Sequence, residues 1–188
     1  MTARIFRITI CCLLFFMVPC SARPQQKIDD LGIRESLHAF VQDFYDWYVP
    51  IALRDHAVPA WDFALKYRKQ VFSAELFRAL KEDSDAQAKA SDLVGLDFDP
   101  FLNSQDPSKR YEADSSTQKG NEYEVKVYAI GSGKKSDVPA VIAELVYNDR
   151  QWQFINFQYP DSGDLLSNLK LLRDDRGKSH SSKSKATN

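Results

Sequence analysis

The chain has 188 residues, with 25 lysines and arginines against 26 aspartates and glutamates, and its formal net charge is −1. This near-neutral balance argues against nucleic acid as the main partner, because neutralising phosphates requires a clustered basic surface. The three cysteines, Cys11, Cys12 and Cys20, all lie near the start of the chain. The residues beyond Cys20 therefore provide no disulfides, thiolate metal sites or cysteine nucleophiles.

The first 22 residues have the pattern of an export signal. Arg4 and Arg7 precede an apolar run over residues 8–18, and small residues then favour cleavage after Ala22. The run is shorter than the roughly 20 residues that cross a bilayer, so we expect no transmembrane helix in the mature chain. The sequence predicts a periplasmic or secreted protein.

Cys20 follows an apolar run, as the lipid-bearing cysteine of a lipoprotein does, but Pro19 precedes it where a small residue is expected. A lipid anchor at Cys20 is therefore the less favoured alternative. Removing the signal takes away two arginines and no acids, so the formal net charge becomes −3. The remaining length fits one domain, which we place at residues 23–173. Residues 174–188 contain no large apolar side chain and are expected to form a disordered polar tail.

Apolar residues spaced three and four positions apart predict an amphipathic helix over residues 33–51, with Pro50 marking its end. A second, shorter helix is expected to begin at Pro59. Ser73 is the expected N-cap of a third helix that ends near Ala90. The polar second half of this third helix, residues 82–89, is expected to be exposed.

From Tyr111 onward the apolar repeat changes to two, which is typical of half-buried strands. Strands are predicted near residues 111–116, 122–129, 140–147 and 151–159, with a tight hairpin at 148–150. A last short helix is expected to follow residues 162–164. Helices placed ahead of an antiparallel sheet of about four strands, with a short C-terminal helix, indicate an α+β fold.

The stretch Leu96–Asp106, LDFDPFLNSQD, interleaves acids, amides and large apolar residues more densely than an ordinary linker. With Tyr48 upstream and the strand WQFINF downstream, it resembles a bacterial family of exported proteins catalogued as domain of unknown function number 3828. The resemblance covers about residues 33–172. It implies membership of the nuclear-transport-factor-2-like (cystatin-like) superfamily, in which helices fill the concavity of a curved antiparallel sheet. It implies no reaction and no catalytic residue.

The oxygen-bearing side chains of this stretch are candidates for a ligand site: Asp97, Asp99, Asn103, Gln105 and Asp106. Oxygen clusters suit calcium, but a proline follows Asp99 and no glycine supplies the turn of a calcium loop. We therefore predict no metal site and no cofactor. In the leading interpretation these side chains bind backbone amides while the neighbouring apolar residues fill the core, and a ligand site is the alternative.

The superfamily resemblance also implies a pocket at the open end of the sheet. Tyr48, Trp61 and Trp152 are candidate lining residues, with Asp97 or Asp99 at its mouth. The sequence has no serine in a nucleophile-elbow pattern and no pair of histidines with metal-ligand spacing. We therefore predict no catalytic residue.

Three functions are compatible with these observations. The leading hypothesis is a non-enzymatic module that binds a protein or a small ligand through the rim of its sheet. The first alternative is a small cone-shaped enzyme with an aspartate base, which requires Asp97, Asp99 or Asp106 to face an enclosed cavity. The second is an immunity-like inhibitor of a toxin delivered to the envelope.

Overall fold

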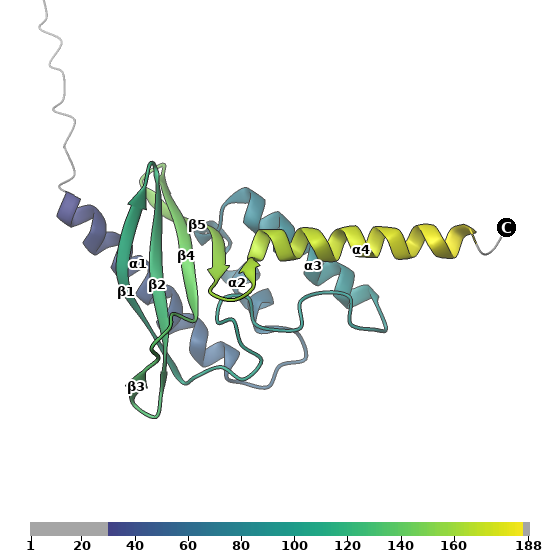
Figure 1. Cartoon of the computed structure of the whole chain (residues 1–188), viewed down its shortest axis with the longest axis horizontal. Helices are drawn as coiled ribbons and strands as arrows, with labels where there is room; N and C mark the ends of the chain where they lie inside the picture. Colours follow the sequence, from purple (N-terminus) through teal and green to yellow (C-terminus); the bar gives the residue numbers. More distant parts are fainter. Residues whose placement is uncertain (1–29, 186–188) are drawn as a thin grey trace, which may run out of the picture.

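A computed structural model describes residues 30–185 of the chain. The predicted export signal, its expected cleavage after Ala22 and the alternative lipid anchor at Cys20 all fall outside the described residues. In chain order the elements are α1 (Asp30–Ala52), α2 (Ala60–Tyr67), the short 3₁₀ helix η1 (Lys69–Val71), α3 (Ala74–Lys89), β1 (Arg110–Lys119), β2 (Glu122–Gly131), β3 (Lys134–Lys135), β4 (Val141–Asn148), β5 (Gln151–Tyr159), β6 (Gly163–Asp164) and α4 (Leu165–Lys185). The helix-then-strand order confirms the α+β prediction (Figure 1).

The strands form one antiparallel sheet in the order β1-β2-β4-β5-β6, and β3 pairs with β2. The four long strands are those that the sequence predicts, and β3 and β6 add two short ones. Bulges interrupt the β1–β2 and β4–β5 ladders, at residues 113–116 and 144–145. Asp149 and Arg150 both have positive φ, 49° and 67°, which is the geometry of a two-residue type I′ hairpin and confirms the predicted turn.

The core lies between the sheet and α1, which crosses one face of the sheet in Figure 1. Phe44 of α1 is its centre, because its ring packs against the rings of Phe72, Phe101 and Phe154. The stripe predicted for this helix is buried at Leu37, Val41 and Tyr48 as well. The helix continues two residues past Pro50, because the Leu53 N–H still closes a turn onto the Val49 carbonyl at 3.1 Å.

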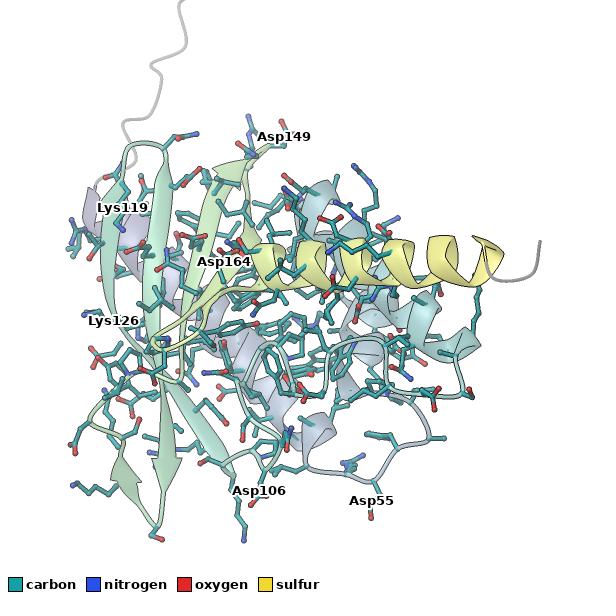
Figure 2. The ribbon with its side chains drawn as sticks, turned by 45° about the vertical axis from the view of Figure 1, so that its right-hand side comes forward. Asp55, Asp106, Lys119, Lys126, Asp149 and Asp164 are labelled. Atoms are coloured by element: carbon teal, nitrogen blue, oxygen red, sulfur yellow. The ribbon has the colours of Figure 1, made fainter. Side chains whose placement is uncertain are left out.

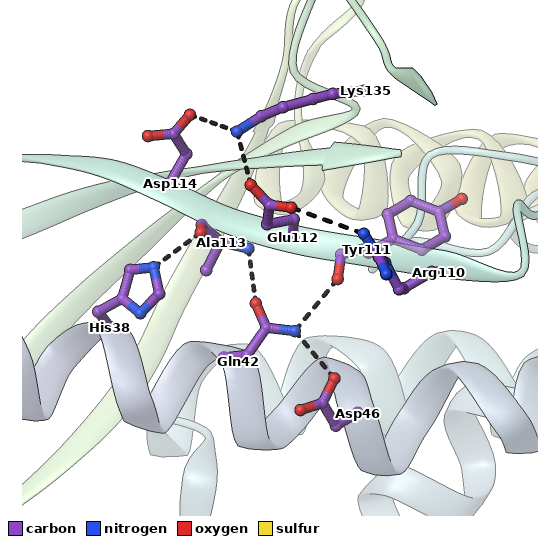
Figure 3. Close-up of polar contacts among 9 residues, drawn as sticks. All are labelled: His38, Gln42, Asp46, Arg110, Tyr111, Glu112, Ala113, Asp114 and Lys135. Atoms are coloured by element: carbon purple, nitrogen blue, oxygen red, sulfur yellow. Dashed lines mark hydrogen bonds and ion pairs between the residues drawn. The ribbon is translucent and has the colours of Figure 1, made fainter. Parts of the chain in front are cut away.

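Polar side chains of α1 also bind the outer edge of β1 (Figure 3). Gln42 accepts a hydrogen bond from the Ala113 N–H at 2.9 Å and donates to the Tyr111 carbonyl at 3.1 Å. His38 Nε2 lies 2.7 Å from the Ala113 carbonyl oxygen. Since these backbone groups have no neighbouring strand on that side, the helix takes the place of a strand there.

The remaining helices lie on the far side of β5, with α3 and α4 side by side (Figure 1). Pro59 precedes α2, and Ser73 caps α3 by accepting from the Leu76 N–H at 3.2 Å, as the sequence predicts. Asp164 caps α4 by accepting from the Ser167 N–H at 3.0 Å. None of the helices within residues 30–185 is long and apolar enough to cross a membrane.

The structure differs from two expectations about these helices. The second half of α3 is only partly exposed: Glu82, Ala88 and Lys89 are exposed, but Asp83 is buried and residues 84–87 are half-buried, because α4 and the segment after α3 lie against them. The last helix does not end near Arg173, and its backbone is helical to Lys185, where we expected a disordered tail. Arg176 holds this extension against the domain by donating to Asp83 and to the Val94 carbonyl.

Candidate functional site

The central stretch forms a tight turn around Asp99, which is buried. Its carboxylate accepts hydrogen bonds from the Phe101 and Leu102 N–H groups at 3.0 and 3.1 Å. The Asp99 N–H donates to the Ser104 carbonyl at 3.0 Å, and Asn103 adopts a positive φ of 49° to complete the turn. Phe101 and Leu102 enter the core, as the leading interpretation of the sequence expects.

A tyrosine from α1 completes the surroundings of this carboxylate. The Tyr48 hydroxyl donates to Asp99 Oδ2 at 2.5 Å. Burial raises the pKa of Asp99 to about 6, although the hydrogen bonds from Tyr48 and from the two backbone amides act in the opposite direction. Burial, with the nearby Asp99 charge as a smaller cause, also raises the pKa of the Tyr48 hydroxyl well above its usual range. The hydroxyl therefore acts as a neutral donor.

Two further tyrosines hold the backbone of the same turn. The Tyr45 hydroxyl donates to the Phe101 carbonyl at 2.9 Å, and the Tyr159 hydroxyl donates to the Pro100 carbonyl at 3.0 Å. Their donors come from α1 and β5, so the turn ties the first helix to the last long strand. Its hydrogen bonds are those of a structural element, in which each oxygen of the Asp99 carboxylate already has a donor.

The other predicted oxygen ligands do not gather around Asp99. Asp97, Asn103, Gln105 and Asp106 are exposed, and Figure 2 shows Asp106 at the outer surface. Asn103 donates to the Ala140 carbonyl at 3.1 Å instead of facing the acids. Among the described residues there is no group of three or more His, Cys, Asp or Glu side chains placed to hold a metal ion.

The three predicted aromatic residues are also separate. Tyr48 contacts Asp99, whereas the indole N–H of Trp152 donates to Ser36 Oγ at 3.1 Å. Ser36 precedes Tyr48 by twelve positions on α1, about 18 Å along the helix axis at 1.5 Å per residue. Trp61 is buried on α2, and no described residue accepts a hydrogen bond from its indole N–H. These three residues therefore do not line one pocket.

A large open groove lies elsewhere, between α3, the segment after it and α4, with a volume of about 1800 Å³. One face of α3 forms its first wall. The other wall is formed by α4, through Leu172, Arg173, Asp175, Arg176 and Gly177. The wall residues of α3 are three and four positions apart: Ala74, Phe77, Arg78, Lys81, Glu82, Asp85, Ala86 and Lys89. None of the site residues predicted from the sequence lines this groove.

The segment after α3 closes one end of the groove, and hydrogen bonds from Gln87 of α3 fix this segment in place. The Gln87 side chain accepts from the Val94 and Gly95 N–H groups at 2.9 and 3.1 Å and donates to the Asp92 carbonyl at 3.2 Å. Leu93 stays 64% exposed and lines the groove. In the sequence, a leucine directly after the polar residues Ser91 and Asp92 is a signal that could have indicated this surface.

Comparisons with known proteins give no match: no family model matches the chain, and neither do curated proteins or solved structures. The resemblance to the exported family therefore stays a prediction. The candidate site depends on the geometry alone, and the groove between α3 and α4, at about 1800 Å³, is larger than the hollow of about 500 Å³ that Arg34, His38 and Asp114 line.

Proposed function

We propose that this protein is an exported, non-enzymatic binding module and that the groove between α3 and α4 is its partner-binding surface. The observation that carries the proposal is the size and openness of the groove, about 1800 Å³. Small-molecule pockets usually enclose about 300–1,000 Å³. A segment of a partner protein fits the larger volume better than a metabolite does.

The lining of the groove supports the same conclusion. Apolar side chains lie along it, including Phe77, Leu93 and Leu172, and charged residues lie among them. Surfaces that bind other proteins combine apolar and polar side chains in this way. The binding surface is then on the helices rather than at the rim of the sheet, since Gln153 is the one lining residue that β5 provides.

The enzyme alternative finds less support. Of the three aspartates it considers, Asp97 and Asp106 are exposed, and Asp99 is enclosed by donors from the protein itself. None of the three lines the groove between α3 and α4. An immunity-like inhibitor would be one form of the proposed binding module, because it too acts by occupying a partner protein.

Site-specific photo-crosslinking in the native host tests the proposal, with the full chain carrying the photoreactive residue at Leu93. Leu171 is the matched control, because it is also an exposed leucine, at 63%, but does not line the groove. We expect one protein to be crosslinked from position 93 and not from 171. That protein, once purified, should bind the native chain and lose at least about tenfold in affinity for Ala86→Arg, which fills the groove. Equal crosslinking from both positions, or undiminished binding to Ala86→Arg, would exclude the groove.

A further inference from the structure

The two ends of the groove differ in charge. At the end where α3 begins, the lining residues include Lys69, Arg78 and the amides Gln70 and Gln153, and no acid lines the groove there. Gln153 donates to the Gln70 carbonyl at 3.4 Å, so β5 and η1 meet at this end. At the other end Glu82, Asp85 and Asp92 line the groove together with Lys89. We call these the cationic end and the mixed end.

The charges at the cationic end are available to a partner. Lys69 Nζ lies 4.6 Å from the centre of the Phe77 ring, and neither Lys69 nor Arg78 forms an ion pair with any described residue. Three other lining cations already have acids: Lys81 pairs with Asp85 at 2.5 Å, Arg176 pairs with Asp83 at 2.6 Å, and Arg173 lies 3.9 Å from Glu82. Lys89 forms no ion pair with a described residue, but it lies among the acids of the mixed end. Two of the three lining cations without an ion pair to a described residue, Lys69 and Arg78, therefore lie together at the cationic end.

The dipole of α3 adds to this difference. Its N-terminus, which carries a partial positive charge, lies at the cationic end, and its C-terminus lies at the mixed end. Glu75 in the first turn offsets part of this field, but it does not line the groove. A negative group is thus favoured beside Lys69 and Arg78.

We infer that the partner segment is an acidic amphipathic helix whose acidic C-terminal end lies against Lys69 and Arg78. This inference rests on the proposed function. The walls are mainly side chains of two helices, and Gln153 is the one β5 residue that lines the groove, so the contact is a helix in a groove rather than an added strand. The wall of α3 runs from residue 74 to residue 89, about 24 Å, which accommodates a helix of about 15 residues. The apolar face of that helix packs on Phe77, Leu93 and Leu172.

The test is a selection from a random library of displayed peptides, about 15 residues long, on the native full-length chain. We expect the enriched peptides to combine apolar residues at helical spacing with acids near the C-terminal end. They should bind Lys69→Glu/Arg78→Glu about tenfold more weakly, and replacing their acids by lysines should restore the affinity. Lys126→Glu/Lys170→Glu is the control, since it makes the same charge change at exposed lysines outside the groove.

The outcomes separate this inference from the proposed function. In one outcome the enriched peptides lose affinity for Ala86→Arg, but they are neutral or basic and bind Lys69→Glu/Arg78→Glu normally. That result contradicts the inference of an acidic partner helix and supports the groove as the binding surface. If no enriched peptide is affected by Ala86→Arg, the groove is not the binding surface and both proposals fall. If both double variants weaken binding equally, the net charge of the protein and not the cationic end is responsible, which overturns the inference.

Discussion

Arg176 of α4 donates to the Oδ1 atom of Asp83 in α3 at 2.6 Å, across 93 positions of sequence. The other carboxylate oxygen of Asp83 accepts from the Leu96 N–H at 2.9 Å, and Arg176 also donates to the Val94 carbonyl at 2.9 Å. The Asp83 side chain is only 3% exposed, and the Arg176 side chain is 15% exposed. One ion pair therefore joins the two helical walls of the groove to the segment that closes its end.

Arg176→Met should destabilise the protein by about 3 kcal/mol, because it leaves the Asp83 carboxylate buried without its cation. Arg173→Met is the control, since Arg173 is about half exposed and its contact with Glu82 is 3.9 Å. That change should cost no more than about 0.5 kcal/mol. Urea unfolding of both variants measures the difference. Equal losses would mean that the buried pair does not hold α4 in place.

Gly95→Ala should destabilise the protein, because a Cβ built at Gly95 comes within 2.7 Å of Asp83 Oδ2, which the Leu96 N–H also binds. We expect a loss of about 1–3 kcal/mol, as for other overpacking changes. Gly32→Ala in α1 meets no atom within 4 Å and should stabilise the helix by up to about 1 kcal/mol. Thermal melting of the two variants should therefore shift in opposite directions. A neutral Gly95→Ala would show that Asp83 can move without loss.

Asp99→Asn should change how stability depends on pH. Burial raises the pKa of Asp99 from 3.8 to about 6 in the folded protein, so between these values the native state holds a proton that the unfolded state has released. The contribution of Asp99 to stability is thus full below about pH 4 and is lost as pH rises through about 6. Asparagine does not ionise, so the variant avoids this loss of stability. Between pH 4 and pH 7 its free energy of unfolding should therefore rise relative to that of the native chain by up to about 3 kcal/mol.

Urea unfolding of both proteins at several pH values in this window measures that gain, and Asp106→Asn is the exposed control. The asparagine oxygen can still accept from the Phe101 and Leu102 N–H groups, so the variant is expected to fold. A difference between the native chain and Asp99→Asn that stays constant from pH 4 to 7 would contradict the raised pKa of Asp99.

Gln42→Ala tests the side-chain contacts by which α1 binds the edge of β1. The change leaves the Ala113 N–H and the Tyr111 carbonyl without the partner that replaces a neighbouring strand (Figure 3). We expect a loss of about 2 kcal/mol, with faster hydrogen exchange at the Ala113 amide. Gln105→Ala, at an exposed position, should be neutral within about 0.5 kcal/mol. Unchanged exchange at Ala113 would show that water replaces Gln42 at no cost.

The helices and long strands could be predicted because the spacing of their apolar residues follows the face of each element that is buried. The spacing of Leu37, Val41 and Phe44 follows one helix face, and the alternation of Tyr123, Val125 and Val127 follows one face of β2. The N-cap at Ser73 and the hairpin at 148–150 could also be predicted, since a cap and a hairpin depend on residues only a few positions apart.

The candidate site could not be predicted from local sequence patterns. Asp97 and Asp99 are two positions apart and look equivalent in sequence, yet one is exposed and the other accepts from Tyr48, which lies 51 positions earlier. Asp83 looks like an ordinary surface residue of a polar helix, and the distant Arg176, together with the Leu96 N–H, compensates for its burial. Arg176 itself lies in the helical extension beyond Arg173 that the sequence did not predict.

The sequence alone determined the α+β class, the order of the elements and, apart from the end of α4, their boundaries to within a few residues, because periodic burial and local caps act over one or two turns of chain. Only the tertiary structure decided which acids are buried and where the groove lies. Both depend on segments such as α3 and α4 meeting across about half the chain, and the free energy of burying Asp83 or Asp99 is set by partners that no local pattern specifies.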